Sequence, residues 1–441
     1  MIKNSLKIVK KINNTNGLQF FQLFRYAILL LIGILFTKTS LTTGEIGFYE
    51  SLIFLASAIS FFWISGLVQS LLVVYRKPEN GKKSPELFNA FLLMFFFSLL
   101  AFIVIRIFTG NISTYLNLSG ETELYKLFSW YILLISPSYL IEYIYLLKNK
   151  PRRIILYGLI SYSLQLLFVV LPVLFAYPLI FSVYGLVVIA ILRFLWLIRL
   201  LIRYSIIKVS FPYIKNHISL GYPLIFSSLL SGSGEYIDGL IISNYFDSAT
   251  FAIFRFGAKE FPLFLILANS FSNSMIPEFS KEIEINRILE KIKRNSLKLM
   301  YYFFPISIIL LITSHYFYPI IFNKDFSESA DIFNVYVLLI ITRFIFPQTI
   351  IIGQKHTKII MISSLIEIII NVSISLLLIK PFGIVGVAFG TLAAYSVEKI
   401  ILVFYANYKL KIKPGQYIPV FQYFSLSIIL IVVFIGVLFF V

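Results

Sequence analysis

Long apolar stretches alternate with short polar segments along almost the whole chain. A membrane-spanning helix needs roughly 20 consecutive, mostly apolar residues. Thirteen stretches meet this requirement, at residues 18–38, 46–75, 87–108, 124–147, 154–176, 181–204, 218–244, 250–276, 297–317, 332–352, 359–379, 384–408 and 418–441. The pattern therefore predicts an all-α integral membrane protein.

Composition and charge support this assignment. The chain is 59% hydrophobic and 13% charged, whereas soluble domains carry about 25% charged residues. Of its 38 Lys and Arg residues, 27 fall in segments on one side of the predicted spans and five on the other. Loops rich in Lys and Arg stay in the cytoplasm, so we expect a multi-pass membrane protein with its amino terminus in the cytoplasm.

The net charge of +18 is explained by this loop bias, and we expect no nucleic-acid partner. The chain has no cysteine, which excludes disulfides and thiolate metal sites. Its three histidines are scattered near loops without metal-ligand spacing, so no metal site is predicted.

A faint internal repeat divides the spans into two sets. KNKPRR near Lys150 and GQKHTK near Lys355 both follow the fourth span of a set, 205 residues apart, and GFYE and AIFR share that offset. Six spans per copy give parallel copies. The predicted organisation is an amino-terminal six-helix lobe (1–204), a cytoplasmic linker (205–217), a second six-helix lobe (218–408) and an additional transmembrane helix (409–441).

Charged residues inside the spans are the candidate functional groups, because charges at membrane depth usually face a polar interior. They concentrate between residues 231 and 262, at Glu235, Asp238, Arg255, Lys259 and Glu260. A duplicated membrane protein with such groups is first of all a transporter candidate.

Three of the acidic residues are candidates for binding a coupling ion. Glu235 and Asp238 stand three residues apart, so one helix face can hold both. Glu367 is alone near the middle of the eleventh span. The alternative for the first two is pairing with a basic residue at a helix end. Interhelical pairing, or snorkelling of the side chain towards the cytoplasm, is the expectation for a further set: Glu142, Arg193, Arg343, Glu398 and Lys399.

Short motifs along the chain resemble those of polysaccharide flippases (Wzx-type) of the multidrug/oligosaccharidyl-lipid/polysaccharide exporter superfamily. The motifs are TTGEIGFYESLIF, EYIDGLIIS followed by NYFDSA, IPEFSKE and KPFGIVGVAFGTLAAY. AIF in TFAIFRF departs from the family's glycine–aromatic pair, and thirteen spans depart from its usual twelve or fourteen. The resemblance implies two six-helix lobes around a central cavity lined mainly by spans one, two, seven and eight.

The resemblance also implies a cargo and a way of moving it. Members of this family flip undecaprenyl-pyrophosphate-linked oligosaccharide repeat units across the cytoplasmic membrane, for polysaccharide or O-antigen (lipopolysaccharide) biosynthesis. The resemblance therefore implies location in the bacterial cytoplasmic (inner) membrane. No cofactor is expected, and a proton or sodium gradient is a candidate driving force. Membrane lipids, a polysaccharide polymerase and glycosyltransferases are the implied partners.

The charges in the spans agree with an anionic cargo. Arg25 lies on the first span, and Arg255 with Lys259 on the eighth, where their spacing predicts a shared helix face. A guanidinium can hold a pyrophosphate bidentately. We expect these three residues to bind it, and a structural ion pair is the alternative for Arg25.

Two other functions are weighed against the flippase. A multidrug exporter of the same superfamily that carries organic cations should have an acidic cavity, and here the candidate lining is basic. A membrane glycosyltransferase or polysaccharide polymerase should carry acidic residues in a substantial external loop, and the first external loop, 39–45, has a single acid. We therefore expect no enzymatic activity.

The repeat also suggests a gate. Glu50 and Arg255 occupy matching positions in the two copies, each a few residues from an external turn. If the copies face each other, this pair of opposite charges would close the outer mouth until an anionic cargo competes for Arg255. Local pairing of each residue is the alternative.

Overall fold

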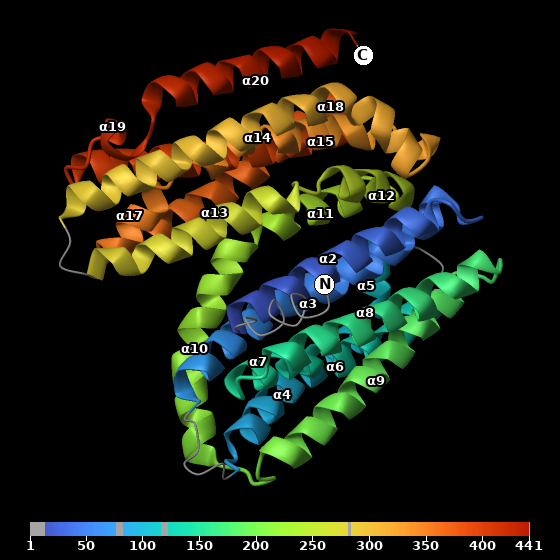
Figure 1. The fold of residues 1–441 in the computed structure, drawn as a ribbon. Coiled ribbons are helices and arrows are strands. Elements are labelled where there is room, and N and C mark those ends of the chain that lie inside the picture. The colour runs from blue at the N-terminus through green and yellow to red at the C-terminus, as the bar shows by residue number, and fades with distance from the viewer. Residues whose placement is uncertain (1–13, 76–82, 116–121, 281–283, 441) are drawn as a thin grey trace, which may run out of the picture. The chain divides into compact units, whose positions relative to one another are not determined.

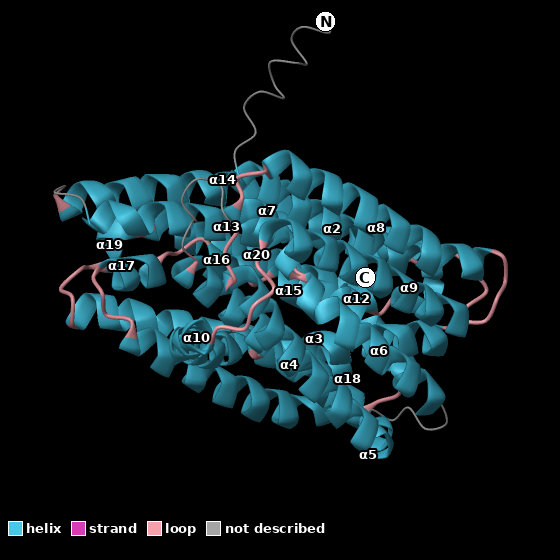
Figure 2. Ribbon diagram, turned by 90° about the horizontal axis from the view of Figure 1, so that it is seen from below, coloured by secondary structure: helices cyan, strands magenta, loops and turns pink. Residues whose placement is uncertain are grey.

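The computed structural model describes residues 14–75, 83–115, 122–280 and 284–440. Helices and short connections make up this part of the chain, and the one β-bridge within it joins Ser84 to Ser205 (Figure 2). Nine of the described helices are long and apolar enough to cross a membrane, or ten with one bent pair counted as a single span. The prediction of an all-α membrane protein is confirmed.

The chain forms two compact units, which are described separately (Figure 1). Unit 1 comprises Met1–Gly232 and Asp247–Ala249, and unit 2 comprises Ser233–Phe246 and Thr250–Val441. The described helices of unit 1 are α2 (Asn14–Phe36), α3 (Thr43–Val74), α4 (Glu86–Ile107), α5 (Thr109–Tyr115), α6 (Thr122–Ser138), α7 (Leu140–Leu147), α8 (Pro151–Leu174), α9 (Ile180–Tyr204) and α10 (Phe211–Gly232).

Unit 2 holds the remaining helices, except that the first two residues of α12 belong to unit 1. They are α11 (Gly234–Tyr245), α12 (Ser248–Gly257), α13 (Pro262–Met275), η2 (Ile276–Ser280), α14 (Ile285–Ile321), η3 (Lys324–Phe326), α15 (Ser329–Val337), α16 (Ile340–Arg343), α17 (Pro347–Gly353), α18 (Lys358–Tyr408), α19 (Pro414–Tyr417) and α20 (Val420–Phe440).

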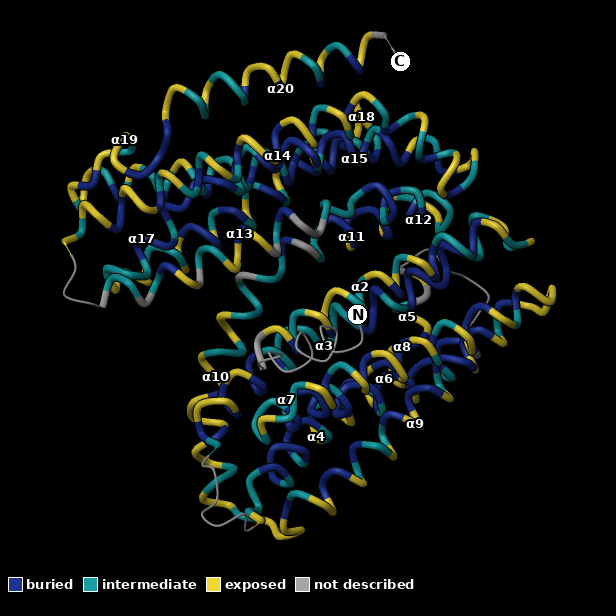
Figure 3. Tube along the Cα trace, viewed as in Figure 1, coloured by how far each residue is buried: buried dark blue, intermediate teal, exposed yellow. Residues whose placement is uncertain are grey.

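Large apolar side chains remain exposed along both units. Phe421 and Phe439 on α20 are 79% and 81% exposed, and Leu377 on α18 is 72% exposed (Figure 3). Soluble monomers rarely expose contiguous apolar surface of this kind. These faces are therefore suited to contact lipid tails, as the predicted spans require.

Several predicted spans of the second set are interrupted. The seventh divides at Ser233 between α10 and α11, and α10 packs closely against α3 of unit 1. Gly66 on α3 permits this approach, because a Cβ there would lie 2.5 Å from the backbone nitrogen of Ile225. Helix α10 belongs to unit 1, and the two compact units divide after Gly232. The internal repeat predicted a linker at 205–217 between two lobes, and those lobe boundaries stay a prediction.

The eighth predicted span is also not one helix. It consists of α12 and α13, separated by the non-helical segment from Ala258 to Phe261. Pro262 begins α13, and a proline disfavours helical backbone at the residue before it. Phe261 accordingly has extended backbone, with φ −62° and ψ 113°.

Two more spans are joined in α18. This helix includes the predicted eleventh and twelfth spans and turns at Gly383, whose φ of +56° and ψ of −138° are not helical. A positive φ is accessible to glycine without the steric penalty of a side chain. The two arms pack on each other, so that Asn371 on the first arm donates to Thr391 on the second.

Orientation follows from the loop charges and stays a prediction. If all thirteen spans cross the membrane, the carboxyl terminus that follows α20 lies outside. A reporter enzyme that works only in the periplasm should be active when it is fused there. Activity of a cytoplasm-specific reporter at the same position would mean that the last segment does not span.

Candidate functional site

Unit 1 contains a pocket lined by both a cation and an acid. Its volume is about 180 Å³, and Arg25 of α2 and Glu142 of α7 both line it. The other lining residues are Leu18, Phe21, Gln22, Phe61, Ile64, Ser65, Val68, Tyr139 and Tyr143. The pocket therefore offers a guanidinium, a carboxylate, two phenols and an amide within one small volume.

The packing of α2 against α8 places Arg25 in this pocket. Phe21, one turn before Arg25, is 2% exposed and lies 5.8 Å from Tyr157 and 5.7 Å from Tyr162, measured between ring centroids. Residues four apart on a helix share a face. The guanidinium carbon of Arg25 lies 5.9 Å from the ring centroid of Phe21 and 6.0 Å from that of Tyr139, at the outer limit of cation–π contact.

Another arginine of unit 1, Arg193, has a structural role. Arg193 on α9 is 5% exposed, donates to Gln165 Oε1 at 2.7 Å and to the Ser161 carbonyl at 3.3 Å, and lies 4.3 Å from the ring centroid of Tyr162. These contacts join α9 to α8. The sequence anticipated an interhelical role for Arg193, although its main partner is an amide instead of a carboxylate.

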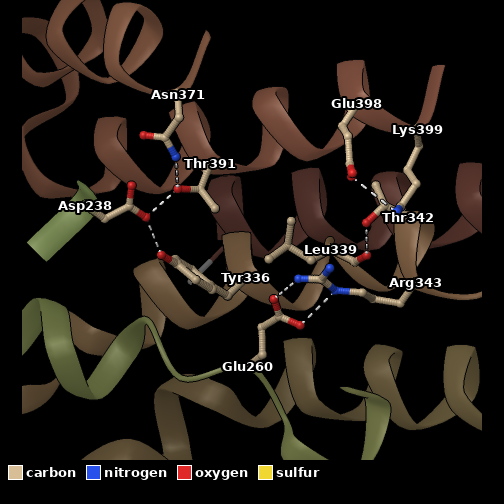
Figure 4. Close-up of polar contacts among 10 residues, drawn as sticks. All are labelled: Asp238, Glu260, Tyr336, Leu339, Thr342, Arg343, Asn371, Thr391, Glu398 and Lys399. Atoms are coloured by element: carbon tan, nitrogen blue, oxygen red, sulfur yellow. Dashed lines mark hydrogen bonds and ion pairs between the residues drawn. The ribbon is translucent and has the colours of Figure 1, made fainter. Parts of the chain in front are cut away.

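In unit 2, Asp238 lies at the centre of a buried polar network (Figure 4). Its Oδ2 atom accepts hydrogen bonds from the Tyr336 hydroxyl, at 2.6 Å, and from the Thr391 hydroxyl. Thr391 in turn accepts from Asn371 Nδ2 at 3.0 Å. The other carboxylate oxygen, Oδ1, is buried and has no hydrogen-bond partner among the described residues.

This arrangement is suited to binding a small cation. Two hydroxyl groups donate to one oxygen of Asp238, and the second oxygen has no hydrogen-bond partner among the described residues. A buried polar atom without a partner is uncommon in native proteins. A proton or a sodium ion at Oδ1 would satisfy this atom, since a carboxylate oxygen is a ligand of the kind that hard cations prefer.

Glu260 forms the other prominent contact of unit 2. It lies in the interruption between α12 and α13 and accepts two hydrogen bonds from Arg343, at Oε1 from Nη2 and at Oε2 from Nε, the latter at 3.1 Å. Arg343 is the last residue of α16 and precedes the interruption before α17. Its guanidinium also lies 4.3 Å from the ring centroid of Tyr395. Glu260 and Arg343 are 83 residues apart along the chain.

Arg255 and Lys259 do not share a helix face, and that prediction is wrong. Helix α12 ends at Gly257, so Lys259 lies beyond it in the non-helical segment, with its ammonium 4.3 Å from the ring centroid of Phe256. Arg255 stands in the last turn of α12, where the helix dipole favours a cation.

Two side-chain hydroxyls hold the end of α12 in place. Tyr318 donates to the Phe256 carbonyl at 3.0 Å, and Ser329 donates to the Ile253 carbonyl at 2.7 Å. Gly257 packs so closely on α15 that a Cβ there would lie 2.5 Å from the Ser329 carbonyl oxygen. Arg255 is therefore carried by a firmly anchored helix end.

The other two candidates for binding a coupling ion are Glu235 and Glu367. Glu235 is the second residue of α11, and its side chain lies outside the described residues. Glu367 on α18 is buried, with 8% of its surface exposed, and a Cβ on Gly234 would lie 3.1 Å from its Oε1. Glu398 belongs to the set expected to pair between helices or to snorkel. Its carboxylate lies 3.2 Å from the ammonium of its neighbour Lys399, so this ion pair is within one helix.

The predicted gate joins residues of different units, Glu50 on α3 and Arg255 on α12, and it stays a prediction. Because the chain has no native cysteine, the pair Glu50→Cys and Arg255→Cys can be crosslinked cleanly. Trapping of the double variant should block export, with each single variant as control. Failure to crosslink even with a short bifunctional reagent would contradict the gate.

Sequence reasoning missed Tyr336, Thr391 and Asn371. Asn371 is an amide within an otherwise apolar stretch, which is a usable signal of a polar contact inside the membrane. Tyrosines and threonines are common in these spans, so the other two carried no comparable signal.

Comparisons with known proteins agree with this architecture. The family model for polysaccharide biosynthesis proteins matches residues 40–331. No curated protein sequence matches. Among solved structures, the inward closed conformation of the lipid II flippase MurJ is similar with a TM-score of 0.69 and 17% identity, over 96% of this chain and 92% of that one.

Two further structures share the fold. The inward-facing conformation of a multidrug resistance transporter of the MATE family has a TM-score of 0.65 and 12% identity, over 91% of this chain and 98% of that one. A transporter of the MOP superfamily from Pyrococcus furiosus, described as having a binding pocket of reversed polarity, has a TM-score of 0.53 and 12% identity, over 91% and 97%. The fold is therefore that of MOP-superfamily transporters.

Proposed function

We propose, from the premise that this chain belongs to the polysaccharide biosynthesis protein family, that it flips undecaprenyl-pyrophosphate-linked oligosaccharide repeat units across the cytoplasmic membrane by alternating access. The observation that carries the proposal is the pocket of unit 1, which Arg25 lines and where its guanidinium forms no hydrogen bond or close ion pair with another residue that the structure describes. A cation held in this way is available to an anionic cargo.

The chemistry of the proposed cargo fits these residues. A pyrophosphate presents several strong acceptor oxygens, and a guanidinium can donate to two of them at once. Arg255 at the end of α12 and Lys259 just beyond it supply further positive charge in unit 2. The similar lipid II flippase MurJ is by its name a carrier of a lipid-linked substrate, which supports the same class of cargo here.

The direct test is flipping in proteoliposomes. Purified protein should move a fluorescent, lipid-linked oligosaccharide diphosphate between leaflets, measured by its accessibility to a membrane-impermeant quencher. The uncharged lipid alcohol, without pyrophosphate, should not be moved. Equal movement of the two lipids would overturn the proposed recognition of pyrophosphate.

A multidrug exporter is the second candidate, favoured by the fold shared with the MATE transporter. An exporter of organic cations should bind them through acidic groups. The same proteoliposomes loaded with a cationic dye distinguish the two: dye efflux without movement of the diphosphate lipid would favour the exporter.

Ion coupling through Asp238 is part of the proposal. Asp238→Asn keeps the size of the side chain and removes the charge that a bound cation would neutralise. We expect this variant to fold and to lose its response to an imposed proton or sodium gradient, with flipping at least about tenfold slower. Each gradient is applied separately in proteoliposomes to identify the ion.

The neighbouring residues provide the control for this experiment. Tyr336→Phe removes one hydrogen bond to Asp238 and leaves the carboxylate in place. Flipping by this variant should therefore still respond to the ion gradient, although less strongly than flipping by the wild type. Full gradient dependence in Asp238→Asn would show that the coupling ion binds elsewhere.

A further inference from the structure

The pocket of Arg25 also contains an acid, Glu142, which has no role in the flipping mechanism proposed above. It lies in the first turn of α7, is 3% exposed and lines the same pocket as Arg25. Its carboxylate forms no ion pair with, and accepts no hydrogen bond from, any other residue that the structure describes. A buried carboxylate without a protein partner is costly, because burial removes its water.

The groups around Glu142 leave Arg25 as its counter-ion. Two cations interact electrostatically with the Glu142 carboxylate, Arg25 on α2 and Arg193 on α9. Three phenols do so as well, those of Tyr139, Tyr143 and Tyr157. Arg193 does not line the pocket and donates its hydrogen bonds to Gln165 and Ser161, whereas Arg25 lines the pocket together with Glu142. Arg25 forms no hydrogen bond or close ion pair with another residue that the structure describes and lies near the rings of Phe21 and Tyr139, so its charge can balance the carboxylate across the pocket.

A cargo phosphate would change this balance. With the pocket empty, one guanidinium and one carboxylate give no net charge. An arriving pyrophosphate engages the guanidinium and places its own negative charge beside the carboxylate. Like charges in a poorly solvated site repel strongly, and a carboxylate responds by taking up a proton.

We propose that Glu142 is the proton-linked counter-ion of Arg25, so that binding of the cargo pyrophosphate at Arg25 is accompanied by uptake of one proton at the Glu142 carboxylate. The proton comes from water and returns to it when the pyrophosphate leaves. The empty pocket then regains its balanced pair of charges, which avoids an uncompensated buried cation. This inference rests on the proposed function, because it requires an anionic cargo at Arg25.

Calorimetry of the full-length protein with inorganic pyrophosphate as probe tests the inference. Titrations in two buffers of different ionisation enthalpy count the protons exchanged on binding. Glu142→Gln should bind pyrophosphate about tenfold more tightly than the wild type, because the repelling charge is gone. The wild type should take up close to one proton more than Glu142→Gln, a difference that cancels protonation of pyrophosphate itself.

Two variants serve as controls. Glu142→Asp keeps a carboxylate and should retain the proton uptake. Glu45→Gln removes an acid of α3 that caps its helix outside the pocket and should behave as the wild type. Thermal unfolding without pyrophosphate verifies that each variant is folded, which separates the effect of charge from loss of structure.

Failure of the inference and failure of the proposed function give different results. If Arg25→Ala abolishes binding while Glu142→Gln matches the wild type in affinity and proton count, the counter-ion role is wrong and the cargo site stands. If the wild type binds no pyrophosphate, or Arg25→Ala binds as tightly as the wild type, both are overturned.

Discussion

Glu260→Ala should lower the free energy of unfolding by about 3–5 kcal/mol, the range measured when one partner of a buried ion pair is removed. The side chains of Glu260 and Arg343 are only 12% and 14% exposed and are joined by two hydrogen bonds. Without Glu260, the guanidinium keeps its contact with Tyr395 and loses its carboxylate. Thermal unfolding in detergent, together with protein levels in the membrane, measures the loss.

A double variant is the matched control. Glu260→Leu combined with Arg343→Met removes both charges and keeps side chains of similar length, so most of the stability should return. Arg343→Lys should be intermediate, because an ammonium cannot reproduce the two parallel hydrogen bonds. If Glu260→Ala unfolds at the wild-type temperature, the pair contributes nothing to stability.

Arg25→Ala and Arg255→Ala should each slow flipping of the lipid-linked diphosphate while protein levels stay normal. A charge-assisted hydrogen bond to phosphate contributes roughly 1.5–3 kcal/mol, which corresponds to about 10- to 150-fold in binding. Lysine at either position should restore only part of the activity, because its single ammonium lacks the planar, bidentate geometry. The proteoliposome assay gives the rates.

An arginine outside the proposed site provides the comparison. Arg199 on α9 is exposed, and Arg199→Ala should leave flipping unchanged. Wild-type rates in both Arg25→Ala and Arg255→Ala would remove these residues from the cargo site. A defect in one of them alone would confine the phosphate to that residue's unit.

Much of the fold can be predicted from the sequence, because the bilayer imposes a simple rule. A backbone in lipid must satisfy its own hydrogen bonds, so an apolar stretch of the right length becomes a helix whatever its neighbours are. The rule did not predict the break in the eighth span. Hydropathy predicted one continuous helix over residues 250–276, whereas the structure interrupts it before Pro262, because a proline disfavours helical backbone at the preceding residue.

The candidate site is less predictable. Charged residues within apolar spans single out Arg25, Asp238 and Arg255 from their cost in a membrane. The residues that contact Asp238 cannot be recognised in the sequence in the same way, because they are not charged. Tyr336 and Thr391 are 98 and 153 residues from Asp238 along the chain, and both are residue types that occur throughout the spans.

The sequence by itself therefore determined that the chain is a bundle of membrane helices and which charges lie within it, because hydropathy and charge are properties of each segment alone. Only the tertiary structure decided that Glu260 pairs with Arg343, that Asp238 receives two hydroxyls, and that Glu142 lines the pocket of Arg25. Such contacts depend on the rotation and relative height of two packed helices. A change of one residue in either helix turns a side chain by about 100° away from its partner, and no pattern within one segment records that relation.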